Sequence, residues 1–372
     1  MEIFKPILTV LVIAGSVAGV SAQNPKQKEQ AYSSPAYLEK IRLPPGFHIE
    51  VYANVPNARA MALAEDGTLF VGSREKGDIY AVTKSKKVIV LDHGLQMPAG
   101  VDYYKGDLYV SAVSKILKYP DILKHLEGPQ HPLVIYDKYP TDTWHGWKFI
   151  RFGPDGKLYV PVGAPCNVCL KDDPLYASIT RINRDGSGLE IIASGVRNTV
   201  GFDWDPETGH LWFTDNGRDM LGDDVPPDEL NELDRDGEHF GFPFVHGNDI
   251  KDPEFWDKRP QDFTWTKPQL CLPAHVASLG MRFYTGMMFP EKYRGGIFIA
   301  EHGSWNRASK IGYRVVFVPV KNGKAQGEEV FASGWLQGQD NWGRPDDVLV
   351  MPDGSLLVSD DFAGKVYRIY YK

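Results

Sequence analysis

One short pattern recurs six times along this chain: a turn that contains glycine, followed by a short strand of apolar residues. Aspartate precedes the glycine in several copies, and such a turn before a β-branched or aromatic run is a strong hairpin signal. The copies lie at 65–71, 105–110, 154–160, 207–213, 294–299 and 352–358. No amphipathic helical run of several turns separates them, which argues against α/β barrels and doubly wound sheets.

Small antiparallel sheets that repeat around an axis form a β-propeller, so six copies predict an all-β, six-bladed β-propeller. We expect residues 43–372 to form this single domain. The early strand at 48–53 and the final strand at 365–370 are placed to pair and close the ring. A long interval separates Gly209 from Gly296, which predicts an insertion, and long ordered loops are often functional.

Composition narrows the class of protein. With 42% hydrophobic and 24% charged residues the chain can bury a full core, which excludes disordered and coiled-coil classes. It has 48 acidic and 41 basic residues, which gives a formal net charge of −7. Binding to a nucleic-acid backbone depends on clustered cations, so we expect no nucleic-acid partner.

The segment 1–22 has the pattern of a secretory signal peptide. Lys5 gives a basic start, an apolar run extends over 7–20, and Val20-Ser21-Ala22 fits a small-x-small cleavage site. A membrane span would need a longer run of about 20 apolar residues. We therefore expect cleavage before Gln23, an N-terminal extension over 23–42, and a soluble periplasmic or secreted protein without a membrane span.

Two of the three cysteines, Cys166 and Cys169, lie close together, and Cys271 stands alone. Covalent c-type haem attachment needs a histidine after the second cysteine, where this chain has Leu170. A thioredoxin-like redox pair would need a βαβ context, and a structural zinc site would need two more ligands. For an exported chain we predict a disulfide between Cys166 and Cys169 and a reduced, buried Cys271.

Loops at one end of a propeller channel can bring side chains from several blades to one point. His145 lies between Trp144 and Trp147, just before the third copy of the repeat. Histidine is the usual general base because its pKa lies near neutrality. Arg197 and Asn198 lie together before the fourth copy, where a turn with a solvated arginine is the alternative interpretation.

The segment 222–231 combines several carboxylates with two prolines. Oxygen ligands of this kind suit calcium, and the candidate ligands are Asp223, Asp224, Pro226, Asp228 and Glu229. A solvated acidic loop explains the same spacing equally well, because no EF-hand register is present.

Two arginines near the last blades, Arg307 and Arg344, are candidates for binding a polyanionic ligand. Arginines that converge on a channel mouth can hold such a ligand through bidentate hydrogen bonds. A surface position is the alternative for each of them.

At these residues the chain resembles the glucose/sorbosone dehydrogenase family, propellers that use pyrroloquinoline quinone (PQQ). The resemblance extends from about residue 43 to the C-terminus. Within the family, the chain is most similar to the sorbosone dehydrogenase branch. It is carried by Gly-x-Arg-Asn at 195–198, Pro-Pro-Asp-Glu-Leu-Asn at 226–231 and His-Gly-Ser-Trp-Asn-Arg at 302–307.

The resemblance implies site residues. It implies that His145, at the family's spacing before the turn at Gly153, is the catalytic base and that Arg197 is catalytic. It also implies a calcium loop within 223–229. The cofactor-binding residues that we predict on this basis are Asn198, His275, Arg307 and Arg344.

The chain departs from the family pattern in three places. Arg344-Pro345-Asp346 stands where family members have two cations flanking one residue. The calcium loop is longer than in glucose-oxidising members, and Trp144 occupies the position before the base.

The function implied by the resemblance is oxidation of an aldose to a lactone, or of a hydrated sorbosone-like aldehyde to an acid. Hydride would pass to PQQ, the proton to His145, and the developing oxyanion would be stabilised by Arg197, while calcium polarises the quinone. The electrons would then pass to an external acceptor such as a cytochrome or a quinone. Trp144 and Trp147 are candidates for stacking on a sugar ring, and buried packing is the alternative for each of them. Two other classes stay open: a calcium-dependent propeller lactonase and a non-catalytic sugar-binding propeller.

Overall fold

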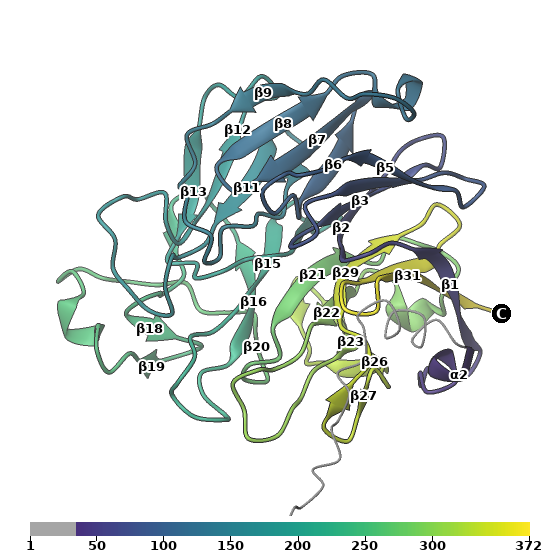
Figure 1. Ribbon diagram of the computed structural model, residues 1–372. Helices are drawn as coiled ribbons and strands as arrows, with labels where there is room; N and C mark the ends of the chain where they lie inside the picture. The colour runs from purple at the N-terminus through teal and green to yellow at the C-terminus, as the bar shows by residue number, and fades with distance from the viewer. Residues whose placement is uncertain (1–34) are drawn as a thin grey trace, which may run out of the picture.

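Each of the six glycine turns connects the first two strands of one antiparallel sheet, and the six sheets follow one another around a common centre (Figure 1). This computed structural model describes residues 35–372. The predicted signal peptide over 1–22 and residues 23–34 of the predicted extension lie outside the described residues. The prediction of an all-β, six-bladed propeller is confirmed.

Blades 1 to 3 are built from consecutive strands. Blade 1 contains β2 (Ala58–Leu63), β3 (Leu69–Ser73), β4 (Ile79–Val82) and β5 (Val88–Asp92). Blade 2 contains β6 (Val101–Tyr104), β7 (Asp107–Ala112), β8 (Lys115–Tyr119) and β9 (Leu133–Tyr136). Blade 3 contains β10 (Arg151–Phe152), β11 (Leu158–Val162), β12 (Ser178–Ile182) and β13 (Glu190–Ser194).

Blades 4 to 6 follow the same order, with the first strand innermost. Blade 4 contains β14 (Phe202–Trp204), β15 (Leu211–Asp215), β16 (Asp228–Leu233) and β20 (Leu270–Leu272). Blade 5 contains β21 (Ser278–Phe283), β22 (Ile297–Glu301), β23 (Arg314–Val318) and β26 (Glu329–Ala332). Blade 6 contains β29 (Pro345–Val350), β30 (Leu356–Asp360), β31 (Lys365–Tyr371) and β1 (Phe47–Asn54).

Blade 6 closes the ring by combining both ends of the described chain. The early strand β1 pairs antiparallel with the final strand β31, from Phe47 opposite Tyr371 to Asn54 opposite Lys365. The expected pairing of the strands at 48–53 and 365–370 is therefore confirmed. Because the ring of described blades is closed, it has no terminal blade whose face is left open to another chain.

The long interval between Gly209 and Gly296 contains an insertion after β16. Its strand β17 (Glu238–His239) adds in parallel to β13 of blade 3, and β18 (Val245–His246) forms a hairpin with β19 (Ile250–Lys251). The insertion thus ties blade 3 to blade 4 before the chain returns to β20.

Short elements decorate the ring. They are α2 (Pro35–Leu38), the 3₁₀ turns Ile122–Lys124, Trp256–Lys258 and Glu291–Tyr293, and two hairpins formed by β24 (Val320–Lys321) with β25 (Lys324–Ala325) and β27 (Leu336–Gln337) with β28 (Asp340–Asn341). Arg42, in the predicted N-terminal extension, forms a β-bridge with Ser333 of blade 5. No helix of the described residues is long and apolar enough to cross a membrane.

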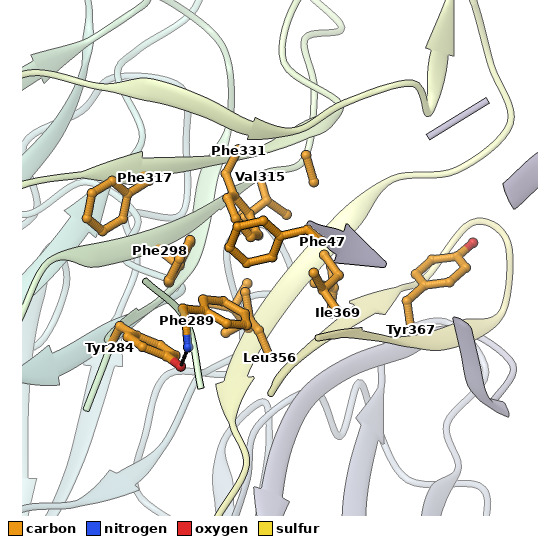
Figure 2. Packing of buried hydrophobic residues seen from close by; sticks show 14 of the residues in the cluster. Phe47, Tyr284, Phe289, Phe298, Val315, Phe317, Phe331, Leu356, Tyr367 and Ile369 are labelled. Atoms are coloured by element: carbon orange, nitrogen blue, oxygen red, sulfur yellow. Dashed lines mark hydrogen bonds between the residues drawn. The ribbon is translucent and has the colours of Figure 1, made fainter. Parts of the chain in front are cut away.

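The hydrophobic core is divided among the interfaces between blades. Each of the six buried clusters in the described residues lies mainly between two successive blades. Figure 2 shows the cluster between blades 5 and 6, where Phe47 of β1 packs edge-on against Phe289 and Phe331. The hydroxyl of Tyr284 accepts the backbone N–H of Phe289 at 2.9 Å in the same cluster.

Glycine allows the inner strands to approach one another closely. A Cβ atom at Gly201, just before β14, would lie 2.2 Å from the backbone oxygen of Leu279 in β21. Because real Cβ atoms do not approach an oxygen this closely, a larger residue at Gly201 would force blades 4 and 5 apart.

Candidate functional site

A cavity of about 430 Å³, the histidine cavity, opens at the end of the central channel where the first strands begin and the second strands end. His145 and Arg197 line it from segments that precede the first strands of blades 3 and 4. Arg74 and His302 directly follow the second strands of blades 1 and 5. Other lining residues are Arg59, Trp147, Asn198, Asn216, Gly217, Asp219, Asp228, His275, Trp305 and Arg344.

His145 is held with one ring nitrogen free for chemistry. Its Nδ1 lies 2.7 Å from the backbone oxygen of Ala164. A carbonyl oxygen only accepts hydrogen bonds, so Nδ1 carries the proton in the neutral ring and Nε2 keeps its lone pair. Burial and the nearby Arg197 cation lower the pKa of His145 to about 3. The side chain is therefore a neutral proton acceptor across the ordinary pH range.

The backbone around His145 requires small neighbours. His145 has a positive φ of 52°, and a Cβ atom at Gly163 would lie 2.6 Å from its Cβ. Behind it, the buried ammonium of Lys148 donates to the backbone oxygen of Gly146 at 2.8 Å, and burial lowers the pKa of Lys148 to about 7. These contacts fix the turn that presents the imidazole.

Arg197 and Asn198 are fixed through the buried carboxylate of Asp215. Its Oδ2 accepts the N–H of Arg197 at 2.8 Å and its Oδ1 accepts the N–H of Asn198 at 2.6 Å. The guanidinium donates from NH1 to the backbone oxygen of Asn216 at 3.1 Å. Burial, with Glu229 nearby, raises the pKa of Asp215 to about 8.

Arginines of blades 1 and 6 form the cationic side of the histidine cavity. Arg344 binds Asp361 through two hydrogen bonds of 2.9 Å. The buried Arg59 bridges Asp346 and Asp361, each at 2.6 Å. The guanidinium carbon of Arg74 stacks 4.0 Å from the ring centre of Trp147.

His302 joins this network beside the same carboxylates. Its Nε2 lies 3.1 Å from Oδ1 of Asp361, and burial lowers the pKa of His302 to about 3. Although burial opposes it, the cations Arg59 and Arg344 help to hold the pKa of Asp361 well below its usual range. His302, Asp346 and Asp361 are close enough to ligate a metal, but the two guanidinium groups already neutralise these carboxylates.

Only Asp228 of the five predicted calcium ligands is among the residues that line the histidine cavity. It accepts the N–H groups of Gly217 at 3.0 Å and Ser278 at 2.9 Å, and burial raises its pKa to about 6. Glu229 instead accepts the N–H of Gly247 at 2.7 Å and lines an adjoining small cavity of about 10 Å³, which shares Arg197 and Asn216 with the histidine cavity. Pro226 is buried in the loop, near Gly217.

The other two predicted ligands, Asp223 and Asp224, bind Arg307, and none of these three residues is among those that line the cavity. NH1 of Arg307 donates to the backbone oxygen of Asp223, and its NH2 donates to Asp224 at 3.1 Å. The side chain of Asp224 is 89% exposed. Arg307 therefore points at the acidic loop rather than into the cavity, in contrast to its predicted role in cofactor binding. A local sequence match could not show this, because the direction depends on a loop of blade 4 that is distant in the sequence.

Of His275 and the two predicted tryptophans, two residues line the histidine cavity and one does not. His275 lines the cavity, and its Nε2 lies 2.8 Å from the backbone oxygen of Gly222. Trp147 lines the cavity, whereas Trp144 is 55% exposed and is not among the lining residues. Trp305 lines the cavity and is 70% exposed.

Cys166 and Cys169 are joined in a disulfide, as the sequence predicted. The third cysteine, Cys271, is free and half-buried rather than fully buried. Burial raises the pKa of its thiol.

Sequence reasoning missed Arg59, Arg74, Asp219 and His302 as lining residues. A signal was available for two of them: Arg74 and His302 each follow the second strand of their blade directly. Asn216 occupies the same place in blade 4, so this position delivers polar side chains to the cavity from three blades.

A second cavity, the opposite cavity, lies at the other end of the inner strands and has a volume of about 410 Å³. It is lined by Asp102, Arg151, Asp203 and Arg282, among others. Its carboxylates bind backbone: Asp102 accepts the N–H of Phe152 at 2.6 Å, and burial raises its pKa to about 6.

A model of a known family matches residues 124–368 and is described as glucose/sorbosone dehydrogenase. An uncharacterised protein of Borreliella burgdorferi is 37% identical over 347 residues, which cover 89% of this chain and 91% of that protein. A pyrroloquinoline quinone-dependent pyranose dehydrogenase of Coprinopsis cinerea is 32% identical over 124 residues, which cover 28% of this chain and 16% of that enzyme.

Solved structures share the fold. The calcium structure of a Trichoderma reesei carbohydrate-active enzyme of family AA12 superposes with a TM-score of 0.76. The two are 17% identical in sequence, and the superposition covers 89% of this chain and 97% of that one.

Proposed function

Because this chain belongs to the glucose/sorbosone dehydrogenase family, we propose that it is a PQQ-dependent dehydrogenase that oxidises an aldose or a sorbosone-like sugar aldehyde. The observation that carries the proposal is the state of His145: a buried, neutral imidazole whose unprotonated Nε2 belongs to a cavity also lined by arginines. The family relationship supports a sugar oxidoreductase, and the substrate within that class is our proposal.

The residues of the histidine cavity fit a flat polycarboxylate. PQQ is a tricarboxylate with an o-quinone, and Arg74 and Arg344 supply guanidinium groups for its carboxylates. The indole Nε1 of Trp147 is buried and has no hydrogen-bond partner among residues 35–372, which leaves one donor for a ligand oxygen. The guanidinium of Arg74 already stacks on the ring of Trp147. A planar ligand would therefore bind next to this pair and not in the place of Arg74.

Calcium is the second proposed cofactor. The carboxylates that line the cavity belong to Asp219 and Asp228, and hard oxygen ligands of this kind suit calcium. A bound cation would also offset the cost of burying Asp228 in its charged form. Asp223 and Asp224 would act only indirectly, by holding Arg307 and the loop.

The chain's own residues divide the work of oxidation. When bound, the quinone would accept the hydride, which carries both electrons of the oxidation. His145 Nε2 takes the proton from the hydroxyl on the carbon that is oxidised. Arg197, buried beside His145, stabilises the negative charge that develops on that oxygen. An aldose gives a lactone in this way, and a hydrated aldehyde gives an acid.

We further propose that the electrons leave to an external acceptor, a cytochrome or a quinone, and that the protein works in the periplasm or outside the cell. The disulfide between Cys166 and Cys169 supports an oxidising compartment. The signal-peptide pattern over 1–22 supports export.

Reconstitution tests the proposal. Purified protein is loaded with PQQ and calcium, and reduction of a dye is followed with a panel of aldoses and sugar aldehydes. Substrate-dependent dye reduction that requires PQQ is the expected result. Hydrolysis of a lactone without PQQ would instead identify a lactonase, and sugar binding without either reaction would identify a binding protein.

Metal removal tests the calcium proposal separately. If Asp219 and Asp228 hold a calcium that contacts PQQ, metal and cofactor must bind cooperatively. PQQ is therefore titrated into the protein with excess calcium and again with excess chelator. A weaker affinity in chelator is expected, and an unchanged dissociation constant would remove calcium from the site.

A further inference from the structure

We propose that the disulfide-closed turn Cys166–Cys169 is a positioning element for Arg197, with Asn167 as its contact residue. The inference rests on the proposed function, because Arg197 matters only if the cavity oxidises a substrate. The sequence predicts the disulfide that closes this turn but assigns the turn no role in the reaction.

Asn167 lies inside the turn and contacts the guanidinium twice. Nε of Arg197 donates to the backbone oxygen of Asn167 at 2.8 Å, and NH2 donates to its side-chain Oδ1 at 3.1 Å. NH1 is bound on the other side by the backbone oxygen of Asn216. All three nitrogens of the guanidinium therefore donate hydrogen bonds, and Asn167 of the turn accepts two of them.

The amide of Asn167 also holds the carboxylate neighbour of the arginine. Its Oδ1 accepts the N–H of Asp219 at 2.7 Å, and its Nδ2 donates to the backbone oxygen of Asp219 at 3.0 Å. The side chain of Asp219 in turn approaches NH2 of Arg197 at 3.3 Å. The amide supplies both the acceptor and the donor that bind the N–H and the C=O of this one residue.

The same stretch of chain fixes His145. The N–H of Ala164 donates to the backbone oxygen of Arg197 at 2.9 Å, and the backbone oxygen of Ala164 binds Nδ1 of His145 at 2.7 Å. Ala164 lies just before Cys166 in the sequence. One short segment after β11 therefore sets the relative position of the base and the arginine.

A covalent closure suits this task. The turn leaves β11 and carries no strand pairing of its own between 166 and 169. A disulfide restricts the conformations of such a segment without a helix or a sheet to support it. Catalytic groups must be held to within a fraction of an ångström, and a displacement of about 1 Å can cost about 100-fold in rate.

The test compares two variants with a matched control. Asn167→Ala removes the side-chain contacts, and the double variant Cys166→Ser/Cys169→Ser removes the closure. Asn183→Ala is the control, because Asn183 makes a turn contact with Ser187 on the same blade and is not among the lining residues. With PQQ bound, both test variants should lose about 10- to 100-fold in kcat, while the control keeps wild-type turnover.

The pH profile separates positioning from general damage. Arg197 is one cause of the low pKa of His145, so a displaced guanidinium raises that pKa. The acidic limb of kcat should therefore move to higher pH in Asn167→Ala and in the double variant. A lower kcat with an unmoved acidic limb would overturn the positioning role.

A measurement without cofactor keeps the inference testable if the proposed reaction fails. In ¹⁵N-labelled protein, the Nε–H resonance of Arg197 is identified by its loss in Arg197→Lys, and its exchange with solvent is followed. We expect slow exchange in wild type and in Asn183→Ala, and faster exchange in both test variants. Equal exchange in all four proteins would overturn the inference, and absent dye reduction in wild type would overturn only the proposed function.

Discussion

The two ends of the central channel use buried charge in different ways. On alternate inner strands, buried carboxylates bind the backbone of the next blade: Asp102 binds Phe152, Asp203 binds Phe283 at 3.0 Å, and Asp347 binds the N–H of Met61 at 2.9 Å. The first two of these carboxylates line the opposite cavity. These contacts link blades 2 and 3, 4 and 5, and 6 and 1. The charges there are used to join blades.

At the histidine cavity, the arrangement leaves hydrogen-bonding capacity unused. His145 keeps Nε2 free, and the indole N–H of Trp147 has no partner in the described part of the chain. Arg74 faces the cavity and forms its ion pair with the exposed Glu75. A buried polar cluster therefore indicates a ligand site when its members lack partners, rather than when it is merely charged.

The largest expected effect comes from removing the free nitrogen. His145→Gln should lower kcat by about 10²- to 10⁴-fold, because the proposed general base is lost, while PQQ affinity stays nearly unchanged. Steady-state dye reduction and PQQ titration measure the two effects. His210→Gln is the control, since His210 binds Glu232 outside the cavity. Wild-type turnover in His145→Gln would remove the base from the mechanism.

Next in size is the loss of the cavity cation in blade 1. Arg74→Ala should weaken PQQ binding by about 10- to 100-fold, because a charge-assisted hydrogen bond to a carboxylate is lost. Fluorescence titration with PQQ measures the dissociation constant. Arg184→Ala, which removes an exposed arginine bound to Tyr109 and Asp107, should leave it unchanged. Equal affinities for the two variants would show that Arg74 does not contact PQQ.

The reverse pattern is expected at the opposite cavity. Asp203→Asn should lower the free energy of unfolding by about 1 to 3 kcal/mol, because the carboxylate binds Arg151 at 2.5 Å and the backbone of blade 5. Turnover should not change. Urea denaturation measures the free energy of unfolding, and dye reduction measures the turnover of the same protein. A loss of activity in a stably folded Asp203→Asn protein would contradict the division between the two ends.

The last expected effect, similar in size to that of Asp203→Asn, is on stability in acid. The pKa of His145 is about 3 in the folded protein and about 6.5 in an unfolded chain, so the unfolded state binds more protons between these values. Its contribution to stability is therefore lost as the pH falls below 6.5. His145→Gln should lose less stability than wild type between pH 7 and pH 5. Thermal melting at both pH values measures the difference, and parallel losses would contradict the low pKa.

The fold could be predicted from the sequence because its signal is local and repeated. Each glycine turn lies between two strands that are adjacent in sequence, and the closing strands occupy the two ends of the domain. The addition of β17 to blade 3 could not be predicted in this way. It is a parallel pairing between segments that are distant in the sequence, and nothing in Glu238 or His239 indicates it.

The site could be predicted only where its residues lie in recognisable local motifs. His145, Arg197 and Asn198 belong to such motifs, and the structure brings them to one cavity. Arg59 and Arg74 come from blade 1, and they meet Arg344 only because the ring closes. Arg307 carries the right charge in the right motif, yet its direction is set by the backbone oxygen of Asp223.

The bridging position of Arg59 has a consequence for the order in which the molecule is completed. Arg59 is synthesised early, whereas both of its carboxylate partners, Asp346 and Asp361, lie near the C-terminus. A buried guanidinium without its counter-ions is costly, so an unfinished ring is disfavoured at this point. The ribosome must release almost the whole chain before Arg59 is neutralised. The Arg59 side of the histidine cavity is therefore completed late, and a chain truncated before Asp346 would lack both of these carboxylates and the closing strand β31.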